Sequence, residues 1–412
     1  MLDYKIIMKL KSKLNLATRI EVDMLGVLFI GSKGAVATTV MMSAILQKHK
    51  VNLNFNMPSD ELGIELADPT DMIFGGWDLN DASYSSMAKS HKVVPDELID
   101  RYKDELDKIH YVPGALQASD RALEQLFDKD LGSYRQSNKM MFVDKIRADI
   151  HNFRQSNNLK KVIVVNTAST DRPYEHSKSW DGLEAFQTGL IEDDPNISTF
   201  MLYAYAALVE HCDVINFTPS KMLDIPAIEE LADKMSQLLA GKDAKTGQTL
   251  WKTVIAPVIK ERGLKLTGWY STNILGNSDG IVVGDDYHGK TKRDTKAGVL
   301  KDILGYDDFN HQVHIHYYPP RGDSKEAWDN VDTVGWFDIP ITIKVNLLAE
   351  DSILAAPVCM DAIRLVDYFG KNGQSGVCHQ IANLWKQPHG TNVHSFQEQI
   401  QMLKDYIDAE IY

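Results

Sequence analysis

A cluster of lysines is the first group of residues whose types and spacing could do chemistry. Lys290, Lys292, Arg293 and Lys296 lie within the segment GKTKRDTKAG. If residues 292–301 are helical, Lys292 and Lys296 share one face near the first turn, where their charges repel each other and oppose the helix dipole. A bound phosphate would reverse both penalties, which makes this cluster a candidate phosphate site. A solvated charged loop explains the same residues equally well.

A glycine turn follows the apolar run LGVLFI at residues 25–30. The run predicts a strand buried on both faces, and the turn at residues 31–39 leads into a helical pattern. Glycine lets backbone N–H groups at a helix start approach a pyrophosphate. The dinucleotide fingerprint GxGxxG is incomplete because Lys33 stands at its second glycine position. Taken alone, the turn fits a plain strand-to-helix connection at least as well.

Three further segments carry polar groups suited to a nucleotide or sugar. Asp78 ends GGWD, after the apolar run 72–74, where a carboxylate could bind ribose hydroxyls or could instead cap a helix within DLNDASYSSM. The segments GKDAKTGQT at residues 241–249 and STNILGNSDG at residues 271–280 are rich in amide and hydroxyl groups. Such residues are also common in ordinary turns.

The composition limits the classes of protein that these residues can serve. The chain has 412 residues, 44% hydrophobic and 25% charged, with a formal net charge of −13. These values are typical of a globular protein and argue against a general affinity for nucleic acid. No apolar run approaches the ~18 residues that span a membrane, and the basic residues 1–24 lack the features of a signal peptide. Three widely spaced cysteines fit a reducing compartment, so we expect a cytoplasmic protein without nucleic-acid or membrane partners.

Two other features receive no functional role. His314 and His316 share one face of an expected strand, but no third ligand is evident nearby, so we expect no metal site. The tripeptide RGD begins at Arg321. We attach no adhesion function to it in an acidic cytoplasmic protein.

The apolar runs must position the polar residues, and they predict a parallel sheet. Short buried runs alternate with longer helical patterns, as in doubly wound folds, where ligands bind beyond the carboxyl ends of the strands. The runs are at residues 25–30, 72–74, 162–165 and 214–217.

From about Trp251 the pattern changes. Residues 312–318 and 341–348 alternate as strands with one solvated face do, and residues 352–370 are helical. We therefore expect an α/β protein with a Rossmann-like doubly wound parallel sheet, interrupted by a smaller β-rich α+β domain. The expected boundaries are an arm or helix at 1–24, the first domain at 25–250 and 355–412, and the inserted domain at 251–354.

Eight sequence segments between about Leu25 and about His389 together resemble those of a known protein family. They are PTDMIFGGWDLND, NTASTDRP, NFTPS, GKDAKTGQT, STNILGNSDG, GDSK, EDSILAAP and LWKQP. In content and order they resemble the inositol-3-phosphate synthase (myo-inositol-1-phosphate synthase) family. That family uses tightly held NAD to isomerise glucose 6-phosphate to myo-inositol 3-phosphate, also called 1L-myo-inositol 1-phosphate. The resemblance implies the same activity in inositol and phospholipid biosynthesis, and a homotetramer whose inserted domain is catalytic and tetramerising.

The resemblance also implies a role for each matched position. The turn at residues 31–39 would bind the NAD pyrophosphate, and Asp78 the adenosine ribose. The implied cofactor-binding positions are Gly31, Gly34, Ala35, Val36, Ala37, Thr38, Asp78, Thr167, Ala168, Ser169, Asp243, Thr246, Asn277 and Asp279. The implied catalytic positions are Lys292, Lys296, Lys325, Lys386, Asp243, Asp351 and Asn273.

The chemistry of the family explains the lysines. Oxidation of the sugar at C5 acidifies the C6 protons, the resulting enolate attacks the C1 aldehyde, and hydride then returns. Negative charge develops first on the C5 oxygen and then on the C1 oxygen, so preorganised lysines lower both barriers. The resemblance favours Lys296 and Lys325 for proton transfer and oxyanion stabilisation. One buried lysine with a depressed pKa could move protons near neutral pH.

Four residues depart from the pattern of the family near expected ligands: Lys33, Lys242, Ile274 and Ser169. The ammonium of Lys33 could reach the diphosphate, or its side chain could point to solvent. Two other hypotheses therefore stay open: a diverged NAD-dependent cyclase or oxidoreductase acting on another sugar phosphate, and a catalytically silent nucleotide-binding homologue. Retention of the four matched lysines and Asp351 argues against a silent protein, since a structural role needs none of them.

Overall fold

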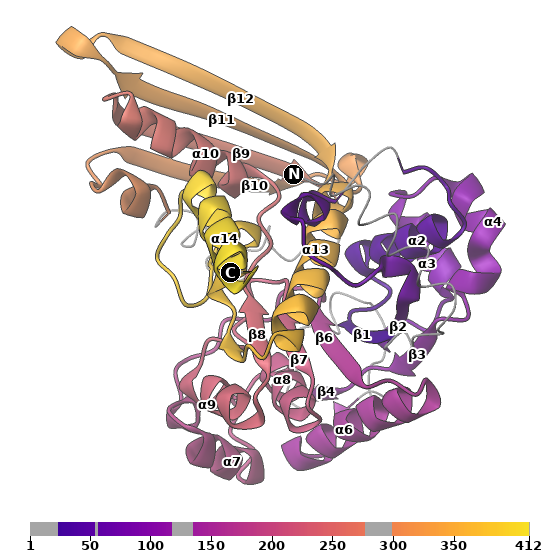
Figure 1. The fold of residues 1–412 in the computed structure, drawn as a ribbon. Helices are drawn as coiled ribbons and strands as arrows, with labels where there is room; N and C mark the ends of the chain where they lie inside the picture. The colour runs from indigo at the N-terminus through magenta and orange to yellow at the C-terminus, as the bar shows by residue number, and fades with distance from the viewer. Residues whose placement is uncertain (1–23, 54–56, 118–134, 277–298, 412) are drawn as a thin grey trace.

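Two main β-sheets organise the chain in this computed structural model, which describes residues 24–53, 57–117, 135–276 and 299–411. The expected arm at residues 1–24 lies almost wholly outside the described residues. The seven-stranded sheet has the order β13-β8-β7-β6-β1-β2-β3, and the four-stranded sheet has the order β10-β9-β11-β12. The long helix α13 (Asp351–Lys371) runs from the smaller sheet to the larger one (Figure 1). None of the described helices has the length and apolar character needed to span a bilayer.

The seven-stranded sheet is parallel throughout, which confirms the prediction. Its strands are β1 (Leu25–Ile30), β2 (Met72–Asp78), β3 (His110–Pro113), β6 (Lys161–Asn166), β7 (Asp213–Asn216), β8 (Leu238–Gly241) and β13 (Gly376–Val377). The prediction was wrong at one strand end, because β2 continues through its two glycines to Asp78. A Cβ at Gly76 would lie 2.2 Å from the carbonyl oxygen of Phe29, so glycine lets β2 pair closely with β1.

Helices cover both faces of this sheet, as expected for a doubly wound fold. Val27 and Phe29 of β1 enter the core beneath α2 (Ala35–Lys48) and α13. Leu28 and Ile30 enter the opposite core, beneath α6 (Lys139–Ser156) and α8 (Thr199–Val209). Burial on both faces explains why this strand shows no polar alternation. Further helices pack around the seven-stranded sheet: α3 (Tyr84–His91), α4 (Asp96–Leu106), α7 (Leu183–Ile191), α9 (Pro226–Met235) and α14 (Phe396–Ile411).

The described residues cover the four-stranded sheet on one face only. It consists of β9 (Lys265–Leu275), β10 (Asn310–Tyr317), β11 (Ser324–Val334) and β12 (Pro340–Glu350). Leu266, Trp269 and Val331 form a core with α10 (Gln248–Glu261) and the helical residues 299–304. The other face exposes large side chains such as Trp328 and Leu348. The alternation in the sequence is therefore explained by one buried and one open face.

The strand order creates a crevice for ligands. From β1 the chain builds β2 and β3 toward one edge, and it then builds β6, β7 and β8 toward the other. Doubly wound sheets bind ligands where this direction reverses, beyond the carboxyl ends of the strands. Gly31 follows β1, Asp78 ends β2 and Thr167 follows β6, so three of the predicted site residues meet there.

Candidate active site

A cavity of about 1030 Å³ opens beyond the carboxyl ends of the parallel strands and extends to the smaller sheet. It brings together most of the predicted site residues: Gly31, Gly34, Ala35, Val36, Asp78, Thr167, Ala168, Ser169, Asp243, Thr246, Asn273, Lys325, Asp351 and Lys386. Ala37 and Thr38 do not line it, because both are buried within α2. Lys292, Lys296, Asn277 and Asp279 lie outside the described residues.

The turn after β1 suits a phosphate. Gly31 has a φ of +80°, and a Cβ there would lie 2.7 Å from the Cα of Ala168, so only glycine fits. Gly34 is the N-cap of α2 and provides no side-chain hydrogen bond, and the first turn of this helix holds no acidic residue. Within the described ranges, no side chain of the cap or of an acidic first-turn residue therefore occupies the N–H groups of that turn. Such a helix start favours an anion electrostatically.

Asp78 lies beside this turn, and its carboxylate is held by the backbone. Oδ2 accepts the N–H of Lys33 at 2.8 Å, and Oδ1 accepts the N–H of Asn80 at 2.9 Å. Burial raises the pKa of this carboxyl, while the two backbone hydrogen bonds act in the opposite direction. The N-cap of α3 is Ser83, whose Oγ accepts the N–H of Ser86 at 3.2 Å. The helix-capping explanation of Asp78 is therefore wrong.

Lys33, at the departure from the glycine fingerprint, is buried, so of the two alternatives the one in which its side chain points to solvent is wrong. Its Nζ donates to the carbonyl oxygen of Asn80 at 2.6 Å and lies 3.3 Å from the centre of the Tyr111 ring. Nε2 of His91 lies 2.8 Å from the carbonyl oxygen of Lys33. These contacts tie the turn after β1 to the segment that follows Asp78.

Two lysine–carboxylate pairs stand at the other end of the cavity. Nζ of Lys386 lies 2.6 Å from Oδ1 of Asp243. Nζ of Lys325 lies 3.2 Å and 3.3 Å from the two carboxylate oxygens of Asp351. The side chains of both lysines are mostly buried, with exposed fractions of 12% and 18%. The paired carboxylates offset the cost of burying these charges.

Backbone pairing places the first of these pairs. Lys242 donates its N–H to the carbonyl oxygen of Gln387 at 2.9 Å, and Lys386 donates its N–H to that of Asp243 at 2.7 Å. Asp243 has a φ of +59°, a left-handed conformation that aspartate tolerates better than most residues. The loop after β8 and the segment around Lys386 thus form one unit at the wall of the cavity.

The second pair depends on the start of α13, where Asp351 is the first helical residue. The carbonyl oxygen of Asp323 accepts the N–H of Asp351 at 3.2 Å, and its Oδ2 accepts the N–H of Ser352 at 3.1 Å. Lys325 is the second residue of β11 and follows Asp323 by two positions. Asp323 therefore holds Asp351 and the start of α13 in place, a role that the sequence did not reveal although GDSK was among the matching strings.

Asn273 of β9 has a side-chain oxygen for which the described part of the chain provides no donor. Its Nδ2 donates to Oε1 of Gln248, whose own Nε2 donates to the carbonyl oxygen of Thr272 at 3.0 Å. Oδ1 of Asn273 is buried and has no hydrogen-bond partner among the residues that the structure describes. A buried acceptor of this kind requires a donor, which a bound amide or hydroxyl can supply. The neighbouring departure, Ile274, does not line the cavity.

The polar cavity-lining residues that were missed from the sequence include Gln248, Arg321 and Asp323. Gln248 stands within GKDAKTGQT and could have been suspected. Arg321 belongs to the RGD tripeptide that was set aside, and it pairs with Glu326. Among the described residues, no three side chains of metal-ligating type gather.

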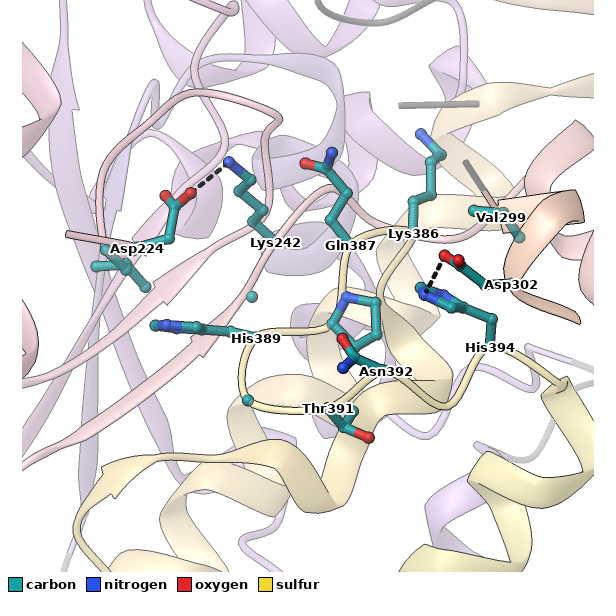
Figure 2. A pocket seen from close by; sticks show the side chains of 14 residues that line it. Asp224, Lys242, Val299, Asp302, Lys386, Gln387, His389, Thr391, Asn392 and His394 are labelled. Carbon is teal, nitrogen blue, oxygen red and sulfur yellow. Dashed lines mark hydrogen bonds and ion pairs between the residues drawn. The ribbon is translucent and has the colours of Figure 1, made fainter. Parts of the chain in front are cut away.

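A second cavity, of about 560 Å³, adjoins the first and shares Lys386 with it. Figure 2 shows two of its polar contacts, in which Nζ of Lys242 lies 2.8 Å from Oδ2 of Asp224 and Nε2 of His394 lies 3.3 Å from Oδ2 of Asp302. The departure at Lys242 therefore belongs to this outer cavity and not to the main one.

The sequence of this chain is similar to known synthases. The sequence model of the myo-inositol-1-phosphate synthase family matches residues 54–407. Inositol-3-phosphate synthase 1 of Bacteroides thetaiotaomicron is 35% identical over 398 residues, covering 91% of each chain. Inositol-3-phosphate synthase of Saccharomyces cerevisiae is 27% identical over 394 residues, covering 84% of this chain and 74% of that one. The solved structure of inositol-3-phosphate synthase from Caenorhabditis elegans has the same fold, with a TM-score of 0.83 at 23% identity, covering 94% of this chain and 86% of that one.

Proposed function

The chain belongs to the myo-inositol-1-phosphate synthase family, and from that membership we propose that it converts glucose 6-phosphate to 1L-myo-inositol 1-phosphate with NAD. One observation supports the proposal most strongly. A single cavity joins the glycine turn after β1, the carboxylate of Asp78 and two lysines that are paired with carboxylates. The first two features suit a dinucleotide, and the lysines suit a reaction that develops negative charge on oxygen.

The residues at the first end of the cavity fit NAD. The pyrophosphate would lie on Gly31 and the start of α2, and Asp78 would accept hydrogen bonds from the adenosine ribose. The orphaned Oδ1 of Asn273 lies at the opposite part of the lining, where a carboxamide or a sugar hydroxyl could satisfy it. When bound, NAD supplies the acceptor and later the donor of hydride at C5.

The lysines act on the sugar. Loss of a C6 proton from the C5 ketone places negative charge on the C5 oxygen. Formation of the C6–C1 bond moves the charge to the C1 oxygen, which then takes up a proton. The ammonium groups of Lys325 and Lys386 would stabilise these oxygens, and the carboxylates of Asp351 and Asp243 would hold the ammonium groups in place. We keep Lys292 and Lys296 as proposed members of the same lysine set.

Product analysis tests the function. Purified protein is incubated with glucose 6-phosphate and NAD, and the product is identified by NMR and by chiral chromatography. We expect inositol phosphate without net formation of NADH, because the hydride returns to C5. Stoichiometric NADH with an oxidised sugar would instead indicate an oxidoreductase, and no turnover would support a silent homologue.

We also propose a homotetramer that uses the open face of the smaller sheet. Trp336 and Phe337, at the turn between β11 and β12, are 86% and 90% exposed. Aromatic side chains this exposed are typical of association surfaces. The strands β9–β12 all lie within the proposed catalytic and oligomerisation domain at residues 251–354, between the two parts of the proposed NAD-binding domain. Light scattering of the wild type and of Trp336→Ser tests the assembly, since a monomeric wild type would exclude it.

A cytoplasmic location and a role in inositol and phospholipid biosynthesis complete the proposal. Cys212, Cys359 and Cys378 are free and buried, which suits a reducing compartment. Burial raises the pKa of all three thiols, so they are unreactive. Fractionation of cells that express the tagged protein tests its location.

A further inference from the structure

Lys245 is a buried lysine in the loop that carries Asp243 and Thr246. Both of these neighbours line the main cavity, whereas Lys245 does not. It is only 4% exposed, and its N–H donates to the carbonyl oxygen of Leu384 at 2.8 Å. The side chain of Lys245 therefore lies on the side of the loop that faces away from the cavity.

The partner of Lys245 is an amide of the C-terminal helix. Nζ donates to Oε1 of Gln399, on α14, at 2.5 Å. Gln399 is fully buried, and its Nε2 donates to the carbonyl oxygen of Val393 at 2.6 Å. The second hydrogen bond turns the amide so that its oxygen meets the lysine.

The surroundings of this ammonium are almost free of opposite charge. In the part of the chain that the structure describes, no carboxylate lies within ion-pair distance of Nζ, and the ring of Phe396 is 5.7 Å away. The nearest titratable group from the segment before α14 is His394, which pairs with Asp302 (Figure 2). Burial and the nearby Lys245 both lower the pKa of His394. A buried lysine whose partner is a neutral amide is costly, so its retention here calls for a role.

We propose that Lys245 and Gln399 are a positioning pair through which α14 holds the loop of residues 243–247 at the wall of the active site. Figure 1 shows α14 beside α10, on which it packs. The loop holds Asp243, the partner of Lys386, so the C-terminal helix fixes the lysine–carboxylate pair from behind. This role deepens the proposed function and rests on it for the activity measurements.

Three variants of the full chain test the pair: Lys245→Met, Gln399→Leu and the double variant. Each single change leaves a buried polar group without its partner and lowers Tm, whereas the double change replaces the pair by apolar side chains and restores most of the stability. Because the loop is no longer held, we expect kcat of the double variant to stay at least about tenfold below wild type and its Kd for NAD to rise about fivefold or more. A double variant with kcat and Kd within about threefold of wild type overturns the proposal.

Two further variants make the result decisive. Lys252→Met removes another buried lysine, whose Nζ lies 2.7 Å from Nε2 of His311 on the smaller sheet; we expect lower stability with kcat unchanged. Gln399→Glu keeps an acceptor for Lys245, so we expect it to retain the kcat that Gln399→Leu loses. Equal kcat values in these two variants would contradict the positioning role of the pair. The Kd for NAD reports on the loop even if glucose 6-phosphate proves not to be the substrate, so failure of the pair and failure of the proposed function are distinguishable.

Discussion

The ammonium nitrogen of Lys386 lies 2.6 Å from Oδ1 of Asp243, and the N–H of the same lysine donates to the carbonyl oxygen of the same aspartate at 2.7 Å. Side chain and backbone thus join two segments that are 143 residues apart in sequence. Because both links involve the same two residues, the position of the ammonium follows that of the aspartate. The loop after β8 therefore sets the place of a positive charge in the cavity.

Removal of this charge should affect turnover and leave cofactor binding intact. Lys386→Met keeps most of the side-chain volume, and we expect kcat to fall by about 10² or more because one strong electrostatic contact to a developing oxyanion is lost. Asp243→Asn keeps a residue that accepts a positive φ but weakens the hold on Lys386, so its loss should be smaller. Steady-state kinetics and NAD titration check both. Equal Kd values and a kcat within about threefold of wild type for Lys386→Met would remove it from the catalytic set.

The pair of Lys325 and Asp351 allows a matched comparison within one sheet. Lys325→Met should lower kcat by about 10² or more without a change in the Kd for NAD. Lys265→Met is the control, since Nζ of Lys265 lies 3.1 Å from Oδ2 of Asp308 on the exposed surface of the same sheet, where an ion pair contributes little. A similar loss of kcat in both variants would indicate a general effect on the sheet.

Two substitutions, five residues apart, distinguish a role in cofactor binding from a role in helix capping. Asp78→Ala should weaken NAD binding about tenfold or more, because a buried acceptor for ribose hydroxyls is lost. Ser83→Ala removes the true N-cap of α3 and should cost about 1 kcal/mol of stability while NAD affinity stays the same. Isothermal titration and thermal unfolding of both variants check this. Tighter binding of NADPH than of NADH by the wild type would contradict the assignment of Asp78.

The sequence allowed the parallel sheet and the first end of the site to be predicted. Alternate residues of the run LGVLFI pack into the hydrophobic cores on opposite faces of the sheet, so the whole strand must be apolar. Since parallel strands end at the same edge, the residues after β1, β2 and β6 had to meet. The assignment of Lys325, Lys386 and Asp351 to one cavity came from the matching strings and not from any local pattern.

The contacts that hold the site together could not be predicted in this way. Lys245 and Gln399 are 154 residues apart, and no spacing in the sequence links them. The partners of Lys33 depend on how the segment after β2 folds back over the turn after β1. Asp323 caps α13 from outside the helix. Each of these is a tertiary contact between a side chain and a distant backbone or amide group, on which hydrophobic periodicity gives no information.

The buried position of Lys33 changes what its substitution should do. Because Nζ is engaged by the carbonyl oxygen of Asn80 and the Tyr111 ring, Lys33→Met should loosen the segment that carries Asp78 and weaken NAD binding several-fold. The N–H to Asp78 remains in this variant. We expect the dependence of Kd on salt concentration to stay parallel to that of the wild type, since the ammonium is already engaged by Asn80 and Tyr111. A steep dependence in the wild type that is flattened in Lys33→Met would show instead that the ammonium reaches the phosphates.

The pH dependence of stability should report on Lys245. Burial lowers the pKa of this lysine to about 7, well below the value of about 10.4 in an unfolded chain. Between these two values the unfolded chain binds a proton that the folded chain does not, so the free energy of unfolding rises with pH, by at most about 1.4 kcal/mol per pH unit. Below about pH 6 both states are protonated and this contribution is constant.

Above about pH 7 the difference between the wild type and Lys245→Met reports on this group, because the neighbouring His394, whose pKa Lys245 lowers, titrates at lower pH. We expect the free energy of unfolding of the wild type, relative to that of Lys245→Met, to rise between about pH 7 and pH 9. Urea unfolding at these pH values measures it. A difference that does not change with pH would mean that the ammonium is as well solvated in the folded protein as in the unfolded chain, which would contradict the burial of the pair.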